Sequence, residues 1–389
     1  MDMKYIKRDL ESTITRKLKT VPVIAVIGPR QSGKSTLIKN ILKKRDNSLY
    51  LDLERPSDLN KLRDAESYFT LNKDMLICLD EIQRMPEIFP LIRSLVDANG
   101  KKGQFIILGS ASAKLLKQSS ESLAGRITYL ELTPFLIPEI AAKKNMTKIR
   151  SLWLRGGFPR SYLAENDLES LEWRNDFIKT FTERDIPLFG FNIPNKGIER
   201  IFSMCAHMHG QILNRSKLGE ALGVSHHTVQ HYLEILSETF LLRIIKPYEK
   251  NTKKRIIKSP KIYIRDSGLL HALLHIKNYD DLFGHPAFGA SWEGFALENI
   301  VSELPGWETY FYRSSSGDEI DLVIENGKNR YALEFKASVA PTVSKGFYNA
   351  IETLAIDAAW IICPIEGQYP IGKNVTVSSP RAFLEQLKS

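Results

Sequence analysis

Apolar residues in the first third of the chain fall into short runs that alternate with segments of helical spacing. Apolar runs bounded by turn residues are typical of buried strands. The four clearest runs are Val21–Ile27, Met75–Leu79, Gln104–Gly109 and Ile127–Leu132. Because strands that alternate with helices form parallel sheets, we predict an α/β domain with a mostly parallel sheet in residues 1–142.

The first of these runs leads directly into a glycine-containing loop, which fits the pattern G-x-x-x-x-G-K-[ST]. The segment after the loop, Thr36–Leu42, has helical spacing. A strand that turns through glycines into a helix directs backbone N–H groups and the positive end of the helix dipole at one point, which favours phosphate. A chance match occurs in roughly one chain in a hundred of this length at average residue frequencies, and the flanking strand and helix weaken that explanation. We therefore predict a nucleotide site.

The residues expected to contact the nucleotide are those of the loop and the start of the helix. They are Gly28, Pro29, Arg30, Gln31, Ser32, Gly33, Lys34, Ser35 and Thr36. Lys34 is expected to reach the β- and γ-phosphates, and Ser35 is expected to hold Mg²⁺. The predicted ligands are therefore ATP and Mg²⁺.

Two acids, Asp80 and Glu81, follow the second apolar run. In folds with such a loop, an acid at the carboxyl end of a neighbouring strand supports the Mg²⁺ ion, and we assign Asp80 to that role. Glu81 can polarise the attacking water, which makes it the candidate general base for hydrolysis. A strand that ends in two solvated acids is also common, and it is the position after the phosphate loop that favours the catalytic interpretation.

The third run ends at Ser110, where a polar side chain can orient the hydrolytic water, and Arg126 closes the segment Leu123-Ala124-Gly125-Arg126. This order of motifs resembles the AAA+ ATPases, and it is most similar to the prokaryotic predicted AAA+ ATPases that carry a C-terminal domain of uncharacterised function. The resemblance covers the whole chain. It implies that Ser110 is the sensor residue and that Arg126 is an arginine finger or sensor. Arg126 also fits a surface arginine beside a strand.

The alternation of strands and helices ends at Thr133–Pro138. A Lys-rich stretch and then a helical segment follow, with a tight loop at Gly156–Pro159. Since a helical lid follows the ATPase core in AAA+ proteins, the resemblance assigns residues 143–199 to a helical lid or linker.

Residues 200–265 have the pattern of a winged helix. Its expected elements are helices at Ile201–Met208, Ser216–Leu222 and His226–Leu236 and strands at Leu241–Pro247 and Ile256–Ile264. In the third helix Val229, Leu233 and Leu236 share one face, as a recognition helix requires. The two strands enclose a basic wing.

The net charge of +9 is concentrated around this wing. Nine cations and one acid, Glu249, lie between residues 243 and 265, which gives a local net charge of +8 in 23 residues. The cations are Arg243, Lys246, Lys250, Lys253, Lys254, Arg255, Lys258, Lys261 and Arg265. Such a segment favours a polyanion, and we predict nucleic acid as the partner of this basic segment, Arg243 to Arg265.

A contact with protein is the alternative for the winged helix. Base readout favours Arg, Lys, Asn or Gln on the recognition helix. The exposed positions there are His226, His227, Gln230 and His231. These histidines have no carboxylate or cysteine at ligand spacing, which argues against a metal site.

Residues 266–389 have the element order helix, three strands, helix, strand, which resembles the core of the PD-(D/E)XK nucleases. The expected elements are a helix at Trp292–Val301, strands at Glu308–Arg313, Glu319–Ile324 and Arg330–Lys336, a helix at Val343–Leu354 and a strand at Ala358–Cys363. The predicted fold class is therefore α/β, with a P-loop AAA+ parallel sheet and helical lid followed by a winged helix and a PD-(D/E)XK-like domain.

The motif residues of such a nuclease are present. Asp321 lies on the second strand, Glu334 and Lys336 form E-x-K on the third, and Glu293 lies on the helix. Residues two apart on a strand point to one face. Asp321 and Glu334 could therefore share a Mg²⁺ ion, with Glu293 close by and Lys336 over the attacking water, as metal-assisted phosphodiester hydrolysis requires. The alternatives are a surface ion pair and an inactive domain of this fold.

The composition is that of an ordinary globular protein, with 43% hydrophobic and 25% charged residues among 389. No apolar run approaches the roughly 18–20 residues that span a bilayer, and the N-terminus lacks the apolar segment of a signal peptide. Three scattered cysteines, Cys78, Cys205 and Cys363, form neither a disulfide framework nor a zinc pattern. We expect a cytoplasmic protein that does not contact the membrane.

Together these features favour an ATPase coupled to a C-terminal half that binds DNA. A stronger form of this hypothesis is that the C-terminal half also cleaves DNA. The alternative is an ATP-gated regulatory scaffold whose C-terminal domains bind protein and whose nuclease-like fold is inactive. A third hypothesis is a nuclease gated by slow ATP turnover. The expected partners are ATP, nucleic acid and a second copy of the chain in a homo-oligomer.

Overall fold

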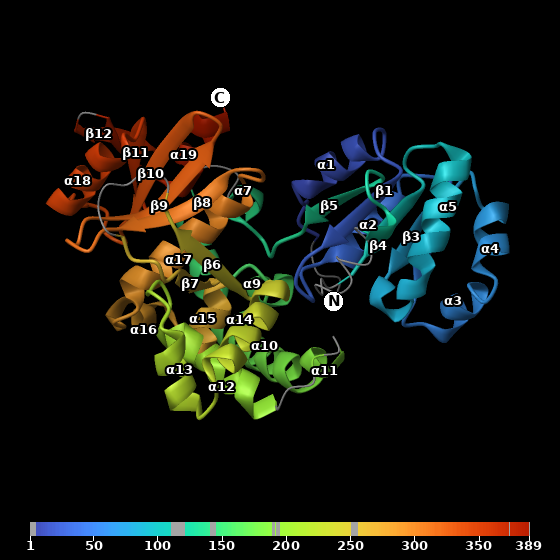
Figure 1. The fold of residues 1–389 in the computed structure, drawn as a ribbon, viewed down its shortest axis with the longest axis horizontal. Helices are drawn as coiled ribbons and strands as arrows, with labels where there is room; N and C mark the ends of the chain where they lie inside the picture. The colour runs from blue at the N-terminus through green and yellow to red at the C-terminus, as the bar shows by residue number, and fades with distance from the viewer. Residues whose placement is uncertain are drawn as a thin grey trace. The chain divides into compact units, whose positions relative to one another are not determined.

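The computed structural model describes residues 5–109, 121–140, 145–188, 191, 195–249, 256–372 and 374–388. The chain divides into two compact units (Figure 1). The first unit comprises Met1–Phe135 with Glu238–Phe240, and the second comprises Leu136–Ser237 with Leu241–Ser389. Each unit is described by itself below.

The first unit is built on a sheet of five parallel strands. They are β1 (Val23–Ile27), β2 (Ser48–Asp52), β3 (Leu76–Asp80), β4 (Phe105–Leu108) and β5 (Ile127–Glu131), in the spatial order β2-β3-β4-β1-β5. The predicted parallel sheet is confirmed. β2 is the strand that the apolar pattern did not indicate, because most of its side chains are only partly buried.

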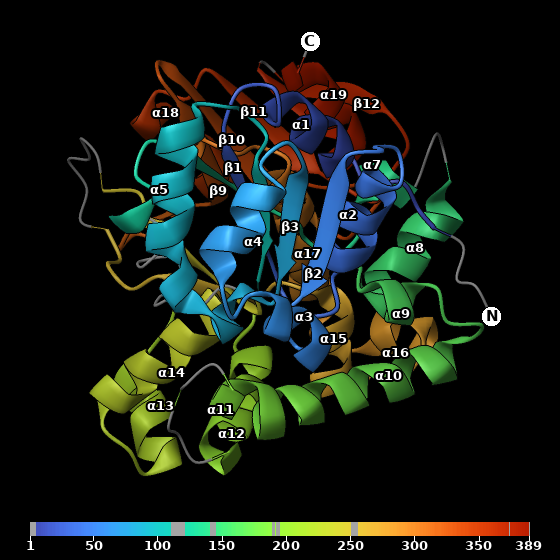
Figure 2. The same ribbon diagram turned by 90° about the vertical axis from the view of Figure 1, so that its right-hand side faces the viewer.

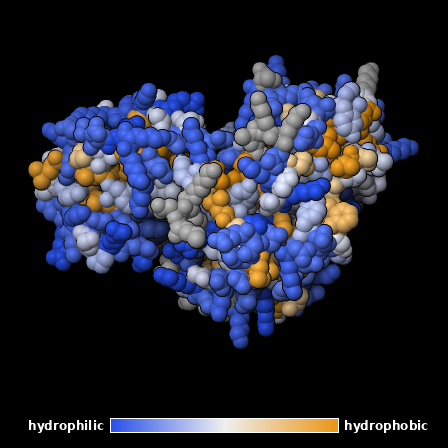
Figure 3. All heavy atoms as spheres, turned by 180° about the vertical axis from the view of Figure 1, so that it is seen from behind, coloured by the Kyte–Doolittle hydropathy of each residue, from blue (hydrophilic) through white to orange (hydrophobic). Residues whose placement is uncertain are grey.

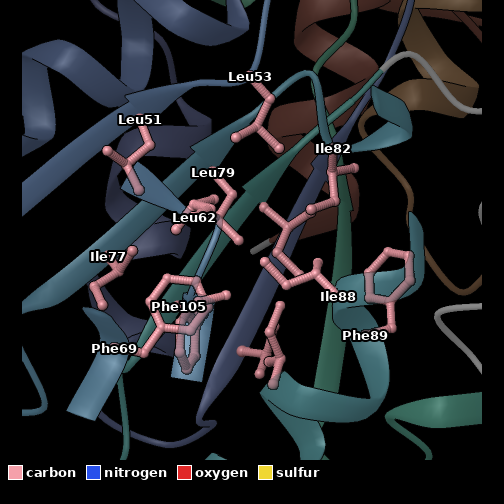
Figure 4. Packing of buried hydrophobic residues seen from close by; sticks show 14 of the residues in the cluster. Leu51, Leu53, Leu62, Phe69, Ile77, Leu79, Ile82, Ile88, Phe89 and Phe105 are labelled. Atoms are coloured by element: carbon pink, nitrogen blue, oxygen red, sulfur yellow. The ribbon is translucent and has the colours of Figure 1, made fainter. Parts of the chain in front are cut away.

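Helices cover both faces of this sheet (Figure 2). They are α1 (Leu10–Lys17), α2 (Lys34–Leu42), α3 (Pro56–Lys61), α4 (Ala65–Leu71) and α5 (Phe89–Asn99), with short 3₁₀ turns at Ile82–Arg84 and Pro86–Ile88. One apolar cluster joins α1 and α2 to the sheet, with Ile14, Leu37 and Ile106 among its members. The other joins α4 and α5 to the opposite face, where Phe69 packs against Phe105 and the same cluster includes Phe89 (Figure 4). The unit is therefore a three-layer α/β/α domain.

The second unit begins with helices and ends in an α/β region. Its first helices are α7 (Ile137–Ile140), α8 (Met146–Arg155), α9 (Pro159–Tyr162), α10 (Asp167–Thr180), the π-helical turn η3 (Phe181–Asp185) and α11 (Ile186–Leu188). The buried guanidinium of Arg174 in α10 donates to the carbonyl oxygens of Leu154 at 3.2 Å and Gly268 at 2.9 Å. The segment expected to be a lid is thereby tied to α15 (Ser267–Leu273), which lies in the predicted nuclease-like region.

Three helices and an antiparallel strand pair follow, in the order expected of a winged helix. They are α12 (Asn195–His207), α13 (Arg215–Leu222), α14 (His226–Glu238), β6 (Leu242–Pro247) and β7 (Lys261–Ile264). Residues 250–255 of the expected wing lie outside the described residues. β6 also pairs in parallel with β8 (Glu308–Arg313) through Lys246↔Tyr310 and Pro247↔Phe311. This pairing makes the strand pair part of a larger sheet.

That sheet has eight strands in the order β12-β13-β11-β10-β9-β8-β6-β7. The remaining elements are α16 (Tyr279–Gly284), α17 (Phe288–Ser302), β9 (Glu319–Asn326), β10 (Asn329–Phe335), α18 (Lys345–Leu354), β11 (Ala358–Ile362), β12 (Gln368–Gly372), β13 (Val375–Ser378) and α19 (Pro380–Lys388). The order from α17 to β11 is helix, three strands, helix and strand. α18 packs with Ile361 on one face, and α19 packs with Trp360 on the other.

Hydrophilic residues cover most of the visible surface of both units, and apolar residues appear there in small groups (Figure 3). In the part of the chain that the structure describes, no helix combines the length and the apolar character needed to cross a membrane.

Candidate functional site

The carboxyl ends of β1, β3 and β4 meet at one edge of the parallel sheet. β4 lies between the other two, with Val26 opposite Leu108 and Leu79 opposite Ile107. The loop after β1 and the acids at the end of β3 therefore lie at the same edge. In open α/β sheets this is the edge where ligands bind.

The loop between β1 and α2 has a backbone that glycine adopts most easily. Gly28 has φ 148° and Gly33 has φ 96°, a region that a Cβ atom disfavours. A Cβ on Gly28 would also overlap the carbonyl oxygen of Leu132. α2 begins at Lys34, directly after Gly33, so the N–H groups of its first turn, which have no partner within a helix, lie at the loop.

Lys34 is buried in this loop with its ammonium held by neutral oxygens. Its Nζ donates to the carbonyl oxygens of Gly28 at 3.0 Å and Pro29 at 2.7 Å. Burial lowers the pKa of Lys34 to about 8, and the nearby charges of Glu81 and Asp80 oppose part of this shift. Within the described residues no carboxylate forms an ion pair with Lys34, so its charge remains available to an anion.

Ser32 places a hydroxyl without a partner inside the same loop. The residue is fully buried, and its Oγ has no hydrogen-bond partner among the described residues. A buried hydroxyl without a partner is costly unless a ligand or water satisfies it. With the Lys34 ammonium, this hydroxyl gives the loop the donors that a phosphate needs.

Asp80 accepts hydrogen bonds from two hydroxyl groups. Ser35 Oγ donates to Asp80 Oδ2 at 2.6 Å, and the Tyr50 hydroxyl donates to the same oxygen. The structure thus brings together Ser35 and Asp80, the two residues expected to hold Mg²⁺. Hydroxyl and carboxylate oxygens are ligands that suit this ion.

Tyr50 is a residue of this site that the sequence analysis missed. It lies on β2, opposite Cys78 of β3, and the ammonium of Lys39 lies 4.5 Å from the centre of its ring. Burial, followed by the hydrogen bond to Asp80, raises the pKa of Tyr50. The alternation of Ser48–Asp52 is the signal that could have indicated β2, but it would not have shown that Tyr50 reaches Asp80.

Glu81 adopts a left-handed backbone conformation, with φ 55° and ψ 48°. For a residue with a side chain this conformation costs of order 1–3 kcal/mol and is concentrated at functional sites. Burial and then the neighbouring charge of Asp80 raise the pKa of Glu81, and its Oε2 accepts a hydrogen bond from Gln83. A carboxylate with a raised pKa is suited to accept a proton from water.

The other predicted nucleotide contacts lie around the loop. Arg30 forms an ion pair with Glu54 at 3.8 Å. Gln31 has a positive φ of 61°. Thr36 is exposed in the first turn of α2, and its carbonyl oxygen accepts from Asn40 at 3.0 Å.

The two remaining predicted residues of this unit are not brought to the loop by the described structure. Ser110 lies outside the described residues. Arg126 lies just before β5 at the amino edge of the sheet, where its guanidinium pairs with Asp97 and its carbonyl oxygen accepts from Val23 N at 3.2 Å. The phosphate loop lies at the carboxyl edge. A role of Arg126 toward a neighbouring molecule stays a prediction.

Arg8 is a second residue that the sequence analysis missed. Its buried guanidinium donates to the carbonyl oxygens of Ser32 at 3.0 Å and Thr133 at 2.6 Å, and it lies 4.9 Å from the ring centre of Phe135. It therefore links the phosphate loop to the segment after β5. A single arginine in a basic N-terminal segment gives no sequence signal of this contact.

A second cluster of acids lies in the sheet of the second unit. The pairing of β9 with β10 runs to Leu322↔Leu333, and continuing it places Asp321 opposite Glu334 on one face. Asp321 Oδ2 accepts from the backbone N–H of Phe335 at 3.1 Å. Lys336 Nζ pairs with Glu334 Oε1 at 2.8 Å. The structure thus brings together Asp321, Glu334 and Lys336.

A lysine that the nuclease motif does not include occupies this cluster. Lys261 Nζ lies 2.8 Å from Glu319 Oε1 and 3.2 Å from Asp321 Oδ1. It also lies 3.5 Å from Oε1 of Glu293, which accepts a hydrogen bond of 2.6 Å from the Tyr263 hydroxyl. Three carboxylates from α17 and β9 therefore meet at one ammonium from β7.

Burial and mutual repulsion change the acidity of these carboxyls. Burial, followed by the charge of Asp321, raises the pKa of Glu293 and that of Glu334. Nearby carboxylates raise the pKa of Lys261 against the opposing effect of burial. Among the described residues no group of three His, Cys, Asp or Glu side chains is arranged to hold a metal ion.

Three cations of the basic segment are used inside the protein. Arg243 and Arg265 both pair with the buried carboxylate of Glu298, at 2.6 and 2.7 Å, and hold its pKa at about 2. Lys261 is the ammonium of the carboxylate cluster. The expectation that all nine cations are available to a polyanion is therefore wrong for these three, since buried acids from other elements neutralise them. Lys246 and Lys258 are exposed.

Comparison with protein families divides the chain into three regions. Residues 20–141 match an AAA domain, residues 146–280 match a domain of unknown function (DUF8612), and residues 288–382 match another (DUF4143). The AAA match and the five-stranded parallel sheet confirm the predicted AAA+ fold of the first unit. The winged helix and the nuclease-like fold stay hypotheses, since the families that match these regions are domains of unknown function.

Two relatives cover nearly the whole chain. The chain is 37% identical over 369 residues to an uncharacterized protein of Mycobacterium tuberculosis and to one of Mycobacterium bovis, which covers 95% of this chain and 82% of each relative. Among solved structures, the Walker-type ATPase of Pyrococcus abyssi is 15% identical with a TM-score of 0.43, over 69% of this chain and 96% of that one. This structural likeness is too distant to carry an argument about function.

Proposed function

The chain belongs to the same family as these uncharacterized mycobacterial proteins, and from this premise we propose that its AAA+ unit binds Mg·ATP and hydrolyses it. The observation that carries the proposal is the contact of 2.6 Å between Ser35 Oγ and Asp80 Oδ2 beside the buried ammonium of Lys34. It joins the phosphate loop to the acid of the neighbouring strand, the pairing that a Mg²⁺-bound nucleotide requires.

Each side chain of the site has a separate task. Lys34 and the backbone N–H groups at the start of α2 hold the phosphates. Ser35 and Asp80 hold Mg²⁺, which neutralises phosphate charge when bound. Glu81 accepts a proton from the attacking water, for which its raised pKa is suited. Arg8 and Tyr50 keep the loop and Asp80 in position.

Isothermal titration of Mg·ATP into the full chain tests the binding site. Replacement of Lys34 by Ala removes the phosphate contact, and we expect no measurable binding. The matched control is Lys43→Ala, an exposed lysine at the end of the same helix, which should bind Mg·ATP like the parent. If Lys34→Ala binds as tightly as the parent, the site is assigned wrongly.

We propose further that the second unit binds the phosphates of nucleic acid. A polar groove of about 500 Å³ lies between the start of α14, the start of α13 and the segment before β7. It is lined by Ile212, Leu213, Asn214, Arg215, Ser216, His226, His227, Gln230 and Ser259. The exposed Lys258 adjoins it. Donors at the start of the expected recognition helix, next to the basic segment, support contact with phosphates.

Fluorescence anisotropy with labelled duplex DNA over a series of salt concentrations tests this proposal. Affinity should fall steeply between about 50 and 200 mM salt, and Arg215→Gln should weaken binding and reduce the salt slope by about 1. Lys277→Gln, which changes an exposed lysine outside the groove, is the control and should leave the slope unchanged. Failure of the parent to bind duplex or single-stranded DNA at low salt would favour the alternative of a protein-binding scaffold.

A further inference from the structure

Lys261 lies at the centre of the carboxylate cluster rather than at its rim. Its side chain is only 4% exposed. Oxygen atoms of Glu293, Glu319 and Asp321 lie between 2.8 and 3.5 Å from its Nζ. These carboxylates come from α17 and β9, whereas Lys261 comes from β7. The ammonium thus lies between acids of separate elements, which share its one positive charge.

The cluster also contains an acceptor that the ammonium does not satisfy. Glu334 is buried, and its Oε2 has no hydrogen-bond partner among the described residues. The charges of Asp321 and Glu293 both act on this carboxyl, so it belongs to the same cluster. Four acids therefore converge on one face with two lysines, Lys261 and Lys336, and one buried oxygen remains unpaired.

The spacing of the oxygens suits an ammonium and not a divalent metal. Distances of 2.8–3.5 Å from Nζ are those of charge-assisted hydrogen bonds and ion pairs. A Mg²⁺ ion binds oxygen at about 2.0–2.1 Å and demands octahedral geometry. An ion at this point would have to displace the ammonium, because two positive charges cannot share a buried site at that distance.

We propose that Lys261 is a tethered cation that holds the place of a divalent metal ion in the carboxylate cluster of the second unit. While Lys261 lies there, the acids bind no such ion. Asp321, Glu334 and Glu293 form no metal-binding group as they lie beside the ammonium. When Lys261 is replaced by a neutral residue, the three carboxylates lose their counter-charge and become available to one divalent cation. Lys261 is therefore the residue that decides whether this cluster is a metal site, independently of ATP hydrolysis by the first unit.

The backbone around Lys261 fixes the position of its side chain in the cluster. β7 pairs with β6 from Leu242↔Ile264 to Ile245↔Lys261. On its other edge Ile212 forms a bridge with Lys261, and Gly210 N donates to Ile262 O at 2.8 Å. Tyr263, two residues further along the same face, is tied to Glu293. Backbone contacts on both sides of β7 therefore hold the ammonium and the phenol beside the carboxylates of α17, β9 and β10.

Binding of Mn²⁺ to the full chain without nucleotide, measured by electron paramagnetic resonance, tests the proposal. Lys261→Met should bind one Mn²⁺ ion at a site that the parent protein lacks. Lys261→Arg, which keeps the positive charge, should gain none. The double variant Lys261→Met/Asp321→Asn should lose the new site, which separates it from Asp80 and Ser35 in the first unit.

Two results would overturn the proposal. One is a parent protein that already binds Mn²⁺ in a manner that Asp321→Asn abolishes. The other is a Lys261→Met variant that is folded by circular dichroism and gains no Mn²⁺ site. If Lys261→Met does not fold, the comparison of the parent with Asp321→Asn still decides, since loss of Mn²⁺ binding contradicts the proposal and equal binding supports it.

Discussion

The two units each bring acids on neighbouring elements close to a buried lysine, and they use the lysine in opposite ways. In the first unit the Lys34 ammonium donates to backbone carbonyl oxygens, and Asp80 accepts from hydroxyl groups. In the second unit the Lys261 ammonium pairs directly with Asp321, Glu293 and Glu319. One site keeps its opposite charges apart, and the other joins them.

The two lysines differ in whether folding alone provides a counter-charge for the buried ammonium. A buried charge held by neutral partners pays for desolvation without a counter-charge, as the lowered pKa of Lys34 shows. The free-energy cost of burying such a charge is offset only when a ligand of opposite charge binds. When a charge is paired within the protein, its counter-charge offsets part of the desolvation cost, and less of the charge is left for a ligand. The first site is therefore organised for a ligand, whereas the second is neutralised by the chain itself.

The largest effect that the comparison predicts is on catalysis in the first unit. Glu81→Gln keeps the shape of the side chain but removes the base, so ATP hydrolysis should fall by about 10²- to 10⁴-fold while ATP stays bound. Phosphate release measured beside isothermal titration separates the two effects. Glu87→Gln, an exposed position a short distance along the chain, should hydrolyse ATP like the parent. Unchanged phosphate release in Glu81→Gln would place the base elsewhere.

The next prediction concerns stability without ligand and compares matched substitutions at the two sites. Asp321→Asn removes one of the partners of Lys261 and should lower the free energy of unfolding of the second unit by about 1–3 kcal/mol, less than the full loss of a buried pair because two carboxylates remain. Asp80→Asn can still accept from Ser35 and Tyr50, and it should change the stability of the nucleotide-free first unit by less than about 1 kcal/mol.

Denaturant titrations can follow the units separately. All five tryptophans lie in the second unit, so tryptophan fluorescence reports Asp321→Asn there, and far-ultraviolet circular dichroism reports both units. Equal losses from Asp80→Asn and Asp321→Asn would break the distinction between a site organised for a ligand and one neutralised by the chain.

The pH dependence of stability tests whether the second unit tolerates a buried positive charge on His271, outside the carboxylate cluster. Burial lowers the pKa of His271 to about 3, and the neutral ring lies between Leu154 O at 2.9 Å and Ser291 Oγ at 2.7 Å. Below a pH of about 6.5 the unfolded chain takes up a proton that the folded chain refuses, so stability falls as the pH falls. The cost of His271→Gln should therefore be largest at pH 7 and smaller by about 1 kcal/mol near pH 5.5.

Denaturant titrations of the parent and of His271→Gln at several pH values, followed by tryptophan fluorescence, measure this difference. A cost of the substitution that does not depend on pH would show that His271 can be protonated in the folded protein.

The smallest effect concerns the hydroxyl groups around Asp80. Tyr50→Phe removes one hydrogen bond to this carboxylate and should weaken Mg·ATP binding by about 0.5–1.5 kcal/mol, the usual net value of such a bond. Isothermal titration measures it, with Tyr68→Phe as the control on another element of the same unit. An affinity equal to that of the parent would show that Ser35 alone positions Asp80.

The parts of the fold that were predictable from the sequence are those determined by neighbouring residues. The phosphate loop with its flanking strand and helix is one continuous segment, and its glycines are required by a local backbone conformation. The order from α17 to β11 follows from apolar runs of strand and helix type. Both could be predicted without knowing which distant parts of the chain contact them.

The contacts that the sequence did not reveal join residues far apart in the chain. Arg8 reaches a carbonyl oxygen 125 residues away, Tyr50 reaches an acid 30 residues away, and Lys261 reaches one 60 residues away. Apolar periodicity indicates which face of an element is buried, but not which polar side chain of a distant element meets it. For this reason the basic segment appeared fully exposed although three of its cations have buried acids as partners.

The parallel pairing of β6 with β8 bears on how the protein can be cut into fragments. A fragment that starts at residue 266 would lose β6 and β7 and turn β8 into an edge strand, with the backbone groups of Phe311 no longer paired to Tyr248. Unprotected edges pair with other chains and promote aggregation. A fragment that starts at residue 136 keeps this edge covered, and we expect it to stay monodisperse at concentrations at which the shorter fragment precipitates.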